Sequence, residues 1–466
     1  MIAHVSTRGG AGRRSFEEVL LAGLAEDGGL FLPESWPRFS REALAAMQGL
    51  SYAETACRIL LPFVEDCFEA AELGELCETA YAGFDHAATA PLVQIAADDW
   101  LLELFHGPTL AFKDFALQLL GLMFERVLAR RGRRITIVGA TSGDTGSAAI
   151  HAVAGRANMA IVVLHPHERV SAVQRRQMTT VEAGNVFNIA VRGTFDDCQA
   201  LVKAMFADTA FRREFDLAAI NSINWARILA QTVYYVFAAL RLGGLERPPV
   251  FAVPTGNFGD VYAGYVAHRI GLPIRRLVVA TNRNDILARF FATGVYRAGE
   301  VVPTVTPSMD IQVASNFERL LFALEGGDGA RVRTKLEEFA RSGMLTVDSA
   351  ELAALAELFL AGRATEEETR AAIRAVWVES GRVVDPHTAV GVHVGRRLRR
   401  PGEGPLVCLA TAHPAKFPET VAEATGRQEA LPPRLGDLMR RQERFAVLDA
   451  DPAAIQGFIR ERLGRR

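Results

Sequence analysis

From residue 91 onward, the apolar positions of the chain alternate between two patterns. Short runs rich in β-branched residues, such as 135–138 and 160–164, are followed by longer stretches in which apolar residues recur at helical spacing. The short runs indicate buried strands and the longer stretches amphipathic helices. We expect further strands at 100–105, 186–191, 249–253, 277–280 and 406–410, and helices over 110–129, 147–154, 170–183 and up to about 270. Because strand and helix alternate over short connections, the pattern predicts βαβ units, mainly parallel sheets and an α/β fold.

The two flanking regions follow a helical pattern. In residues 1–90, apolar residues recur at helical spacing over 16–21 and 52–63, and prolines interrupt the pattern. Residues 328–400 are also expected to be predominantly helical. With 466 residues, of which 49% are hydrophobic, the chain has enough apolar material for two or three domains.

The composition limits the partners and the compartment. A formal net charge of -2 gives the chain no general attraction to nucleic acid or to an anionic membrane, so any phosphate recognition must be local. The five cysteines lie far apart without a CxxC pair, which favours a reducing cytoplasm over a disulfide framework. No apolar run is long enough to span a membrane, and the first ten residues lack the apolar core of a secretory signal. We therefore expect a cytoplasmic protein with a small-molecule partner. No metal site is expected, because the histidines lack metal-ligand spacing.

Two predicted strand-to-helix turns are rich in glycine and hydroxyl residues. The first is GATSGDTG at 139–146 and the second is TGNFGD at 255–260. In such turns, successive backbone N–H groups can face one anion at the positive end of a helix, and glycine leaves room for its approach. Neither sequence is a Walker A or a GxGxxG motif. Each turn alone is equally typical of an ordinary connection, but two of them favour a site for two anionic groups.

A lysine near a predicted helix start is the third candidate for chemistry. Lys113 lies between Phe112 and Phe115 in the segment HGPTLAFKDFALQ at 106–118. The helix dipole and partial burial both disfavour a charged amine there, and a neutral amine is what Schiff-base chemistry requires. A lysine at a helix end can also simply extend its amine to water, and the spacing leaves both interpretations open.

The segments 106–118 and 139–149 together resemble the signature of threonine synthases, which belong to the fold-type II pyridoxal-phosphate enzymes. Further motifs agree in the family's order, at 6–9, 27–31, 221–227, 254–260, 308–311, 385–389 and 411–417. The resemblance spans nearly the whole chain. It implies a tryptophan synthase β-like α/β fold with a helical N-terminal domain over 1–90. A two-lobed catalytic domain would follow over 91–466, with its smaller lobe at roughly 110–215.

The resemblance also implies a cofactor, pyridoxal 5'-phosphate, and roles for individual residues. Lys113 would carry the cofactor as an internal aldimine and move protons. The cofactor phosphate would lie on Gly256, Asn257, Phe258 and Gly259, with Asp260 closing the loop, and Thr411 would face the pyridine nitrogen. Ser142, Gly143, Asp144 and Thr145 would lie over the substrate carboxylate and the ring oxygen. The wider group usually has Asn where this chain has Asp144, so the role of Asp144 stays open.

The implied activity converts O-phospho-L-homoserine and water into L-threonine and phosphate, in a monomer or homodimer. Candidates for holding the substrate phosphate are Arg8, Asn221, Ser222, Arg227, His413 and Lys416. Two alternatives remain. One is a phospho-lyase with the same fold and cofactor that releases 2-oxobutyrate and ammonia. The other is a non-catalytic homologue that binds pyridoxal phosphate or a phosphorylated ligand.

Overall fold

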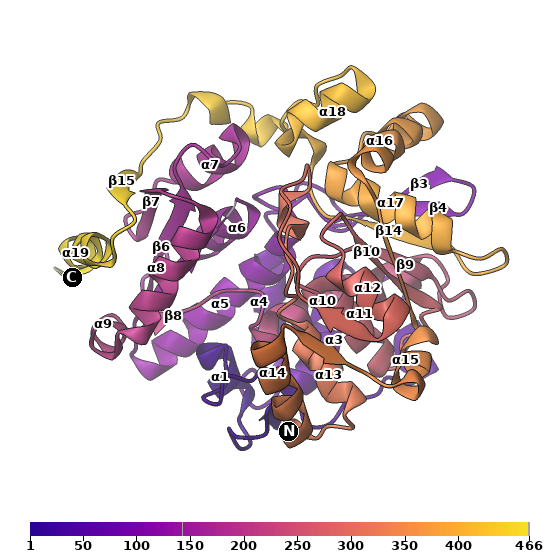
Figure 1. The fold of residues 1–466 in the computed structure, drawn as a ribbon, viewed down its shortest axis with the longest axis horizontal. Helices are drawn as coiled ribbons and strands as arrows, with labels where there is room; N and C mark the ends of the chain where they lie inside the picture. Colours follow the sequence, from indigo (N-terminus) through magenta and orange to yellow (C-terminus); the bar gives the residue numbers. More distant parts are fainter. Residues whose placement is uncertain (142, 465–466) are drawn as a thin grey trace. The chain divides into compact units, whose positions relative to one another are not determined.

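The computed structural model describes residues 1–141 and 143–464. The chain forms two compact units, labelled by element in Figure 1. Unit 1 comprises Met1–Ala116 and Ser222–Glu429, and unit 2 comprises Leu117–Asn221 with the C-terminal segment from Ala430. The domain division predicted from the sequence, at residue 90 and with a smaller lobe at roughly 110–215, stays a prediction.

A six-stranded sheet forms the centre of unit 1 (Figure 1). Its strand order is β13 (Phe359–Arg363), β10 (Arg276–Thr281), β9 (Val250–Pro254), β14 (Leu406–Ala410), β4 (Asp99–Glu103) and β3 (Leu92–Ala96). Each neighbouring pair is parallel except β3 and β4, which run antiparallel. Every residue of β9 and β14 is buried, as expected for strands covered on both faces. The mainly parallel sheet predicted from the pattern is therefore confirmed.

Helices pack closely on this sheet. Helix α17 (Pro386–Leu398) contacts β9, β10, β13 and β14, and α16 (Glu366–Ser380) packs on α17. Two glycines let α17 approach: a Cβ on Gly395 would lie 2.7 Å from the Cβ of Ala252, and one on Gly391 would lie 3.1 Å from Pro254. Helix α10 (Trp225–Arg241) packs against α11 (Gly259–Arg269) and α3 (Tyr52–Val64). Unit 1 also contains α12 (Ile286–Thr293), α13 (Phe317–Leu324) and α18 (Pro418–Thr425).

The N-terminal region is mostly helical, as predicted. It contains α1 (Phe16–Ala22), α2 (Arg41–Ala45), α3 (Tyr52–Val64) and α4 (Ala70–Tyr81), with the short strands β1 (His4–Ser6) and β2 (Phe31–Pro33). Capping boxes start two of these helices, one formed by Ser15 with Glu18 and one by Ser51 with Glu54. Each box satisfies backbone N–H groups that have no partner within the helix, which fixes where the helix begins.

Unit 2 is built around a five-stranded parallel sheet. The strand order is β15 (Ala446–Asp449), β7 (Val186–Arg192), β6 (Met159–Pro166), β5 (Ile135–Ala140) and β8 (Leu217–Ala218). Its helices include α6 (Asp144–Val153), α7 (Ala172–Thr179), α8 (Phe195–Ala207), α9 (Thr209–Glu214) and α19 (Pro452–Leu463). Helix α5 (Lys113–Arg131) begins in unit 1 and continues into unit 2.

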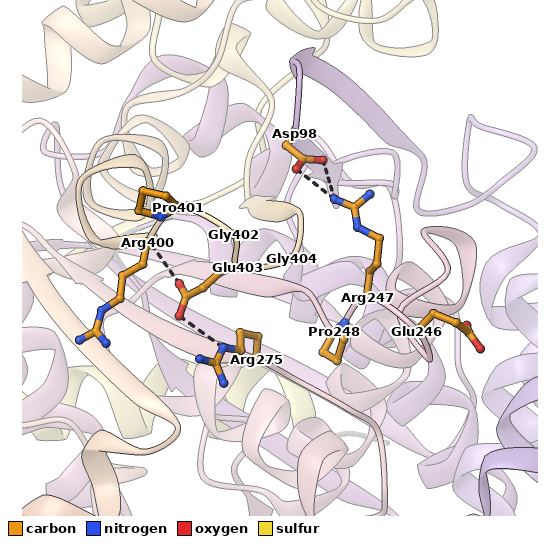
Figure 2. A pocket seen from close by; sticks show the side chains of 10 residues that line it. All are labelled: Asp98, Glu246, Arg247, Pro248, Arg275, Arg400, Pro401, Gly402, Glu403 and Gly404. Atoms are coloured by element: carbon orange, nitrogen blue, oxygen red, sulfur yellow. Dashed lines mark hydrogen bonds and ion pairs between the residues drawn. The ribbon is translucent and has the colours of Figure 1, made fainter.

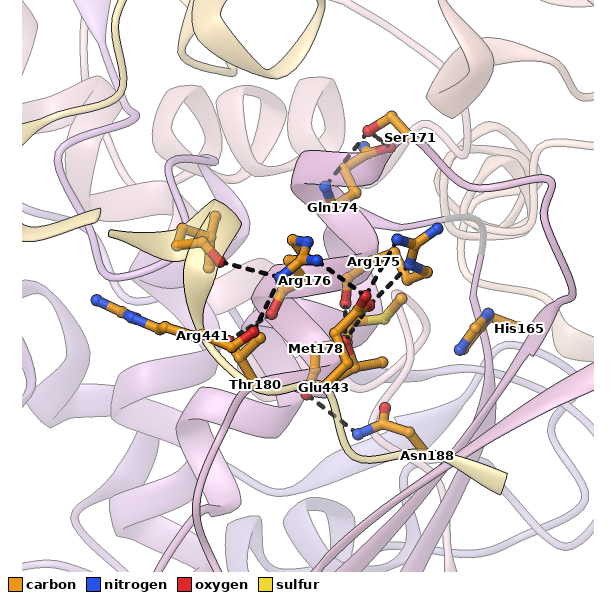
Figure 3. A network of polar contacts seen from close by, with 12 residues as sticks. His165, Ser171, Gln174, Arg175, Arg176, Met178, Thr180, Asn188, Arg441 and Glu443 are labelled. Atoms are coloured by element: carbon orange, nitrogen blue, oxygen red, sulfur yellow. Dashed lines mark hydrogen bonds and ion pairs between the residues drawn. The ribbon is translucent and has the colours of Figure 1, made fainter. Parts of the chain in front are cut away.

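The C-terminal segment is tied into unit 2 by polar contacts on α7 (Figure 3). The Glu443 carboxylate accepts hydrogen bonds from Arg175 Nε and from the Thr179 hydroxyl, each at 2.8 Å. Arg176 donates to the Arg441 carbonyl at 2.9 Å. Strand β15 then extends the sheet beside β7. The last part of the chain therefore completes a sheet whose other strands come from much earlier in the sequence.

Residues 328–400 are predominantly helical, as predicted, but this region also contributes strands that the sequence pattern did not indicate. Residues 328–400 do contain α14 (Gly329–Ser342), α15 (Ser349–Ala356), α16 and α17, but β13 lies among them and joins the central sheet beside β10. Strand β12 (Met344–Thr346) pairs with β11 (Val295–Arg297) in the same region. Strand β13 is a five-residue edge strand with only one fully buried residue, so it has no apolar run that would stand out between helices. Among the described residues, no helix is both long and apolar enough to cross a membrane.

Candidate active site

Three neighbouring strands of unit 1 lead into the candidate cofactor residues. Strand β4 is followed by the loop that ends at Lys113, β14 by Thr411, and β9 by the glycine turn at 255–259. Because β4, β14 and β9 are parallel, their carboxyl ends lie at one edge of the sheet, where α/β proteins bind ligands. The structure thus brings Lys113, Thr411 and the glycine turn to the same edge.

Lys113 is the first residue of α5, as the sequence predicted. Its side chain is buried, and its Nζ lies 5.1 Å from the centre of the Phe112 ring. The preceding loop pairs with the segment after β14: Phe112 N donates to the Thr411 carbonyl at 2.9 Å and His413 N to the Leu110 carbonyl at 3.1 Å. These bonds hold the lysine and Thr411 on adjacent stretches of backbone.

Two buried charged side chains, Asp114 and Lys416, support the lysine loop through Thr109. The Asp114 carboxylate accepts hydrogen bonds from Thr109 N at 2.8 Å and from the Thr109 hydroxyl at 2.7 Å, while Lys416 Nζ donates to the Thr109 carbonyl at 2.9 Å. Burial raises the pKa of Asp114 to about 6, although the Thr109 bonds and the Lys416 charge act in the opposite direction. The fully buried Lys416 amine therefore helps to hold the loop. Its predicted role toward the substrate phosphate stays untested.

The turn after β9 has the shape of an anion cradle. A Cβ on Gly256 would lie 2.6 Å from the Ser308 carbonyl oxygen, so only glycine fits there. Phe258 adopts a left-handed conformation (φ 64°), and α11 begins without a capping side chain. The first N–H groups of α11 therefore remain available to an anion at the positive end of the helix. These features fit the phosphate of pyridoxal phosphate.

Asp260, in the first turn of α11, is buried beneath this cradle. Its Oδ1 accepts hydrogen bonds from the Tyr234 hydroxyl at 2.5 Å and the Tyr235 hydroxyl at 3.0 Å, while its Oδ2 has no hydrogen-bond partner among the described residues. Burial raises the pKa of Asp260 to about 7; the two tyrosine bonds and the charge of Lys113 lower it. The carboxyl is thus poised to change its charge near neutral pH, within the electrostatic range of Lys113.

Thr411 is held by the start of α17. Thr411 N donates to the Thr388 hydroxyl oxygen at 3.2 Å, and Thr388 donates in turn to Asp385, the N-cap of α17. The hydroxyl of Thr411 itself makes no hydrogen bond to another described residue. A hydroxyl with unused bonding capacity, held on a fixed backbone, fits the predicted contact with an unprotonated pyridine nitrogen.

The start of α10 supplies a second candidate anion site in unit 1. Arg227 is 3% exposed, and its Nε and Nη1 have no hydrogen-bond partner among the described residues. Burial lowers the pKa of Arg227 to about 10, so it stays a cation at neutral pH. The next residue, Ile228, reaches the glycine turn, because its Cδ1 lies 3.3 Å from the position of a Cβ on Gly259. Burying a guanidinium without a hydrogen-bond partner costs free energy, and a bound anion would offset this cost.

The other residues predicted for the substrate phosphate in unit 1 have different surroundings. Arg8 makes two bonds to Glu318, from Nε at 3.0 Å and from Nη2 at 2.9 Å. Burial lowers the pKa of His413 to about 4, so it is neutral at neutral pH, and its Nδ1 accepts a bond from Ala415 N. Ser222 precedes α10 and its carbonyl accepts a bond from Asn316. The phosphate roles of these residues, and of the exposed Asn221 in unit 2, stay predictions.

The first glycine turn lies in unit 2. Gly143 has a φ of 146°, and the Thr141 hydroxyl oxygen accepts bonds from Gly143 N at 3.0 Å and Gly146 N at 2.9 Å. Asp144 Oδ1 accepts a bond from Gln174 Nε2 at 2.8 Å, and Thr145 follows in the first turn of α6. Sequence reasoning missed Gln174, because a single glutamine on a neighbouring helix carries no motif. Ser142, which was also predicted for this loop, lies outside the described residues.

A surface pocket of about 550 Å³ occurs elsewhere in unit 1 (Figure 2). Its lining residues include those just before β4, β9 and β14, so it lies at the amino ends of these strands. Its charges largely neutralise each other: Arg247 pairs with Asp98 at 3.0 Å and Arg275 with Glu403 at 3.4 Å. No group of three or more metal-ligating side chains was found among residues 1–141 and 143–464.

Comparison with known proteins gives the class and then the family. Residues 89–356, more than half of the chain, match the family model for pyridoxal-phosphate dependent enzymes. Residues 3–81 match the model for the threonine synthase N terminus, and residues 388–459 that for the threonine synthase C-terminal region. The chain is therefore an enzyme of the pyridoxal-phosphate-dependent class.

Individual relatives identify the family within this class. The threonine synthase of Pseudomonas aeruginosa is 52% identical over 457 residues, covering 98% of this chain and 97% of that protein. The crystal structure of pyridoxal-phosphate-bound threonine synthase from Brucella melitensis is 51% identical, with a TM-score of 0.97 and 99% of each chain covered. Threonine synthase from yeast has a TM-score of 0.95 at 38% identity, covering 100% of this chain and 99% of the other. The chain belongs to the threonine synthase family. The predicted family, fold class and cofactor are thereby confirmed.

Proposed function

We propose that this enzyme converts O-phospho-L-homoserine and water into L-threonine and phosphate. The observation that carries the proposal is the buried Arg227, whose Nε and Nη1 have no hydrogen-bond partner among the described residues. Its neighbour in the chain, Ile228, contacts the glycine turn. The glycine turn at 255–259 would bind the phosphate of the cofactor, and Arg227 would bind a second anion at a separate site. A substrate that carries its own phosphate fits this pair of sites, and members of the threonine synthase family are the relatives of this chain.

When bound, pyridoxal phosphate supplies an electron sink for charge that develops on the substrate carbons. The chain's own residues would then orient the substrate and move protons. Lys113 would hold the cofactor through its amine, and the same amine would carry protons at the substrate α and β carbons. The Lys113 side chain is buried, and its Nζ lies 5.1 Å from the centre of the Phe112 ring. Both tasks require the amine in its neutral form. The turn from Gly256 to Asp260 would bind the cofactor phosphate, and Thr411 would donate to the ring nitrogen.

The substrate phosphate would lie at the start of α10. Arg227 would contribute a fixed cation there, and the first turn of the helix would contribute the positive end of its dipole. Ser222 and Asn221 precede the same helix in the sequence. Arg8, His413 and Lys416 all have protein partners or a neutral charge state in this structure, so we place Arg227 ahead of them. A cytoplasmic location, which five cysteines without a disulfide bond favour, belongs to the same proposal.

The decisive experiment is product analysis with O-phosphohomoserine. Threonine and phosphate are expected in equal amounts, and Lys113→Ala should abolish both. Phosphate with 2-oxobutyrate and no threonine would instead identify a phospho-lyase, and no turnover of any product would favour a binding protein.

The substrate-phosphate site has its own test. Arg227→Met keeps the length of the side chain and removes the charge. Loss of a charge-assisted bond costs about 1.5–3 kcal/mol, so kcat/KM should fall roughly 10- to 150-fold, mainly through KM. Arg241→Met is the matched control, because Arg241 lies at the other end of the same helix. Equal kinetics for the two variants would remove Arg227 from the site.

A further inference from the structure

Two loops proposed above to bind different phosphates meet at one buried side chain. The first is the glycine turn at 255–259, and the second is the segment 222–224 that leads into α10. Asn316, the N-cap residue of α13, is fully buried between them. Its Nδ2 donates to the Ser222 carbonyl at 3.1 Å and to the Asn257 carbonyl at 3.2 Å. One amide group therefore fixes the separation of the two loops.

The orientation of the Asn316 amide is set by Arg319, one turn further along α13. Arg319 Nη1 donates to Asn316 Oδ1, so the other end of the amide must be the donor. Arg319 Nη2 also donates to the Ile223 carbonyl at 2.6 Å, and its Nε donates to the Phe31 carbonyl at 3.1 Å. Arg319 is as fully buried as Asn316. With these bonds, the guanidinium locks the amide and anchors the second loop directly.

The backbone of Asn316 adds a further bond to the glycine turn. Asn316 N donates to the Asn257 carbonyl at 3.0 Å, and its Nδ2 lies 3.2 Å from the position that a Cβ on Gly259 would occupy. A displacement of the turn must therefore move Asn316, and through it the Ser222 carbonyl. The contacts are short, buried and made to backbone atoms on both sides, so the two loops cannot shift independently without breaking hydrogen bonds.

We infer that Asn316, locked by Arg319, is a positioning residue that couples the cofactor-phosphate turn to the substrate-phosphate loop. Coupling of this kind is reciprocal: an anion bound at either loop strengthens binding at the other. The inference rests on the proposed function for the identity of the two phosphates. Among the described residues, the side-chain hydrogen bonds of Asn316 go to backbone carbonyls and to Arg319, so it acts through the loops and is not itself a catalytic residue.

The test uses the holoenzyme with inorganic phosphate as the probe. In the parent protein, saturating inorganic phosphate should slow the release of pyridoxal phosphate into an excess of a trapping protein. In Asn316→Ala this effect should disappear. The same variant should bind both pyridoxal phosphate and inorganic phosphate about three- to tenfold more weakly, which corresponds to the loss of about one hydrogen bond at each loop.

Asn316→Asp is the second variant, because Ala could also prevent folding. The carboxylate keeps the volume and the bond from Arg319 but cannot donate to either carbonyl, so it should also lose the coupling. Hydrogen exchange at the amides of 222–224 in the holoenzyme should be faster in both variants. Asn185→Ala is the matched control, since Asn185 is likewise buried and donates to the Val153 and Met159 carbonyls, each at 2.9 Å, in unit 2. It should lower stability without changing either affinity.

Two results would overturn the inference. One is an Asn316→Ala protein that loses affinity for pyridoxal phosphate alone, with unchanged inorganic phosphate binding and unchanged exchange at 222–224. The other is phosphate that leaves cofactor release unaffected, or speeds it, in the parent protein. Neither measurement uses turnover. A parent protein that makes no threonine but shows the coupling would therefore contradict the proposed function and leave the coupling intact.

Discussion

The buried carboxyl of Asp260 makes a prediction about stability that depends on pH. The change is Asp260→Asn, which removes the titration and keeps an oxygen that can accept from Tyr234 and Tyr235. Burial raises the pKa of this carboxyl from its ordinary value of 3.8 to about 7, with the two tyrosines and Lys113 as the neighbours that oppose the shift. Because the folded pKa is raised, the folded chain holds a proton that the unfolded chain has already lost. The free energy of unfolding must therefore fall as the pH rises through this range.

The size of the effect follows from the two pKa values. One pKa unit corresponds to about 1.4 kcal/mol, so the complete loss between acid and alkaline pH is about 4 kcal/mol. About half of this loss, about 2 kcal/mol, falls between about pH 5.5 and about pH 8.5. The amide that replaces the carboxyl in the D260N protein does not titrate, so this part of the pH dependence should vanish. Any constant cost of the substitution cancels when each protein is compared with itself at the two pH values.

Tryptophan fluorescence gives a specific assay. The four tryptophans, Trp36, Trp100, Trp225 and Trp377, all belong to unit 1, so denaturant unfolding of the cofactor-free protein reports on the unit that contains Asp260. Asp196→Asn is the control, because Asp196 also lies in the first turn of a helix but is less buried than Asp260. It should leave the pH dependence unchanged. If D260N and the parent lose the same stability between the two pH values, the Asp260 carboxyl does not titrate near neutral pH.

Two further predictions concern the cofactor contacts. Gly259→Val should weaken retention of pyridoxal phosphate more than tenfold, and far more than it changes folding, because the new side chain would displace the turn that binds the cofactor phosphate. A Cβ there would lie 3.2 Å from Asn316 and 3.3 Å from Ile228, and equilibrium dialysis measures the affinity. Gly457→Val is its control, since a Cβ there meets nothing within 4 Å, and equal affinities would place the phosphate elsewhere. Thr411→Val should shift the absorption spectrum of the bound cofactor and weaken its binding by about 1–3 kcal/mol. Thr411→Ser keeps the hydroxyl group, so its spectrum and affinity should match those of the parent protein. An unchanged spectrum in the Val variant would mean that Thr411 does not face the ring.

The parts of this site that depend on local sequence could be predicted. Lys113 does begin a helix between aromatic residues, and Thr411 does follow a buried strand. Both features follow from the succession of apolar runs and turns, because the carboxyl ends of parallel strands must share one edge. The resemblance to a family then gave these positions their chemical roles, which spacing alone left open.

The contacts that adjust the site could not be predicted, because they join residues distant in the sequence. Nothing near Asp260 indicates that Tyr234 and Tyr235 donate to it from another helix. Nor does the surrounding sequence show that Asn316 bridges two loops. Lys416 is a further example: its position after Thr411 did not indicate that its amine donates to the Thr109 carbonyl, and its predicted role toward the substrate phosphate stays untested. A polar residue type limits what a side chain can do, and only the packing decides which partner it meets.

The charges of unit 1 suggest why these contacts are arranged in this way. Arg227 is buried, and two of its nitrogens lack a hydrogen-bond partner among the described residues. The N–H groups at the start of α11 have no capping side chain. Two positively polarised places in one unit therefore lack a negative partner. The nearby carboxyl of Asp260 does not satisfy either of them, because it accepts from two tyrosines and its burial favours the neutral form. A permanently ionised acid beneath the turn would repel an arriving phosphate, whereas an acid that can take up a proton permits its approach. Incomplete charge pairing therefore destabilises the free protein. Binding of two phosphates relieves this destabilisation, which contributes to the free energy of binding.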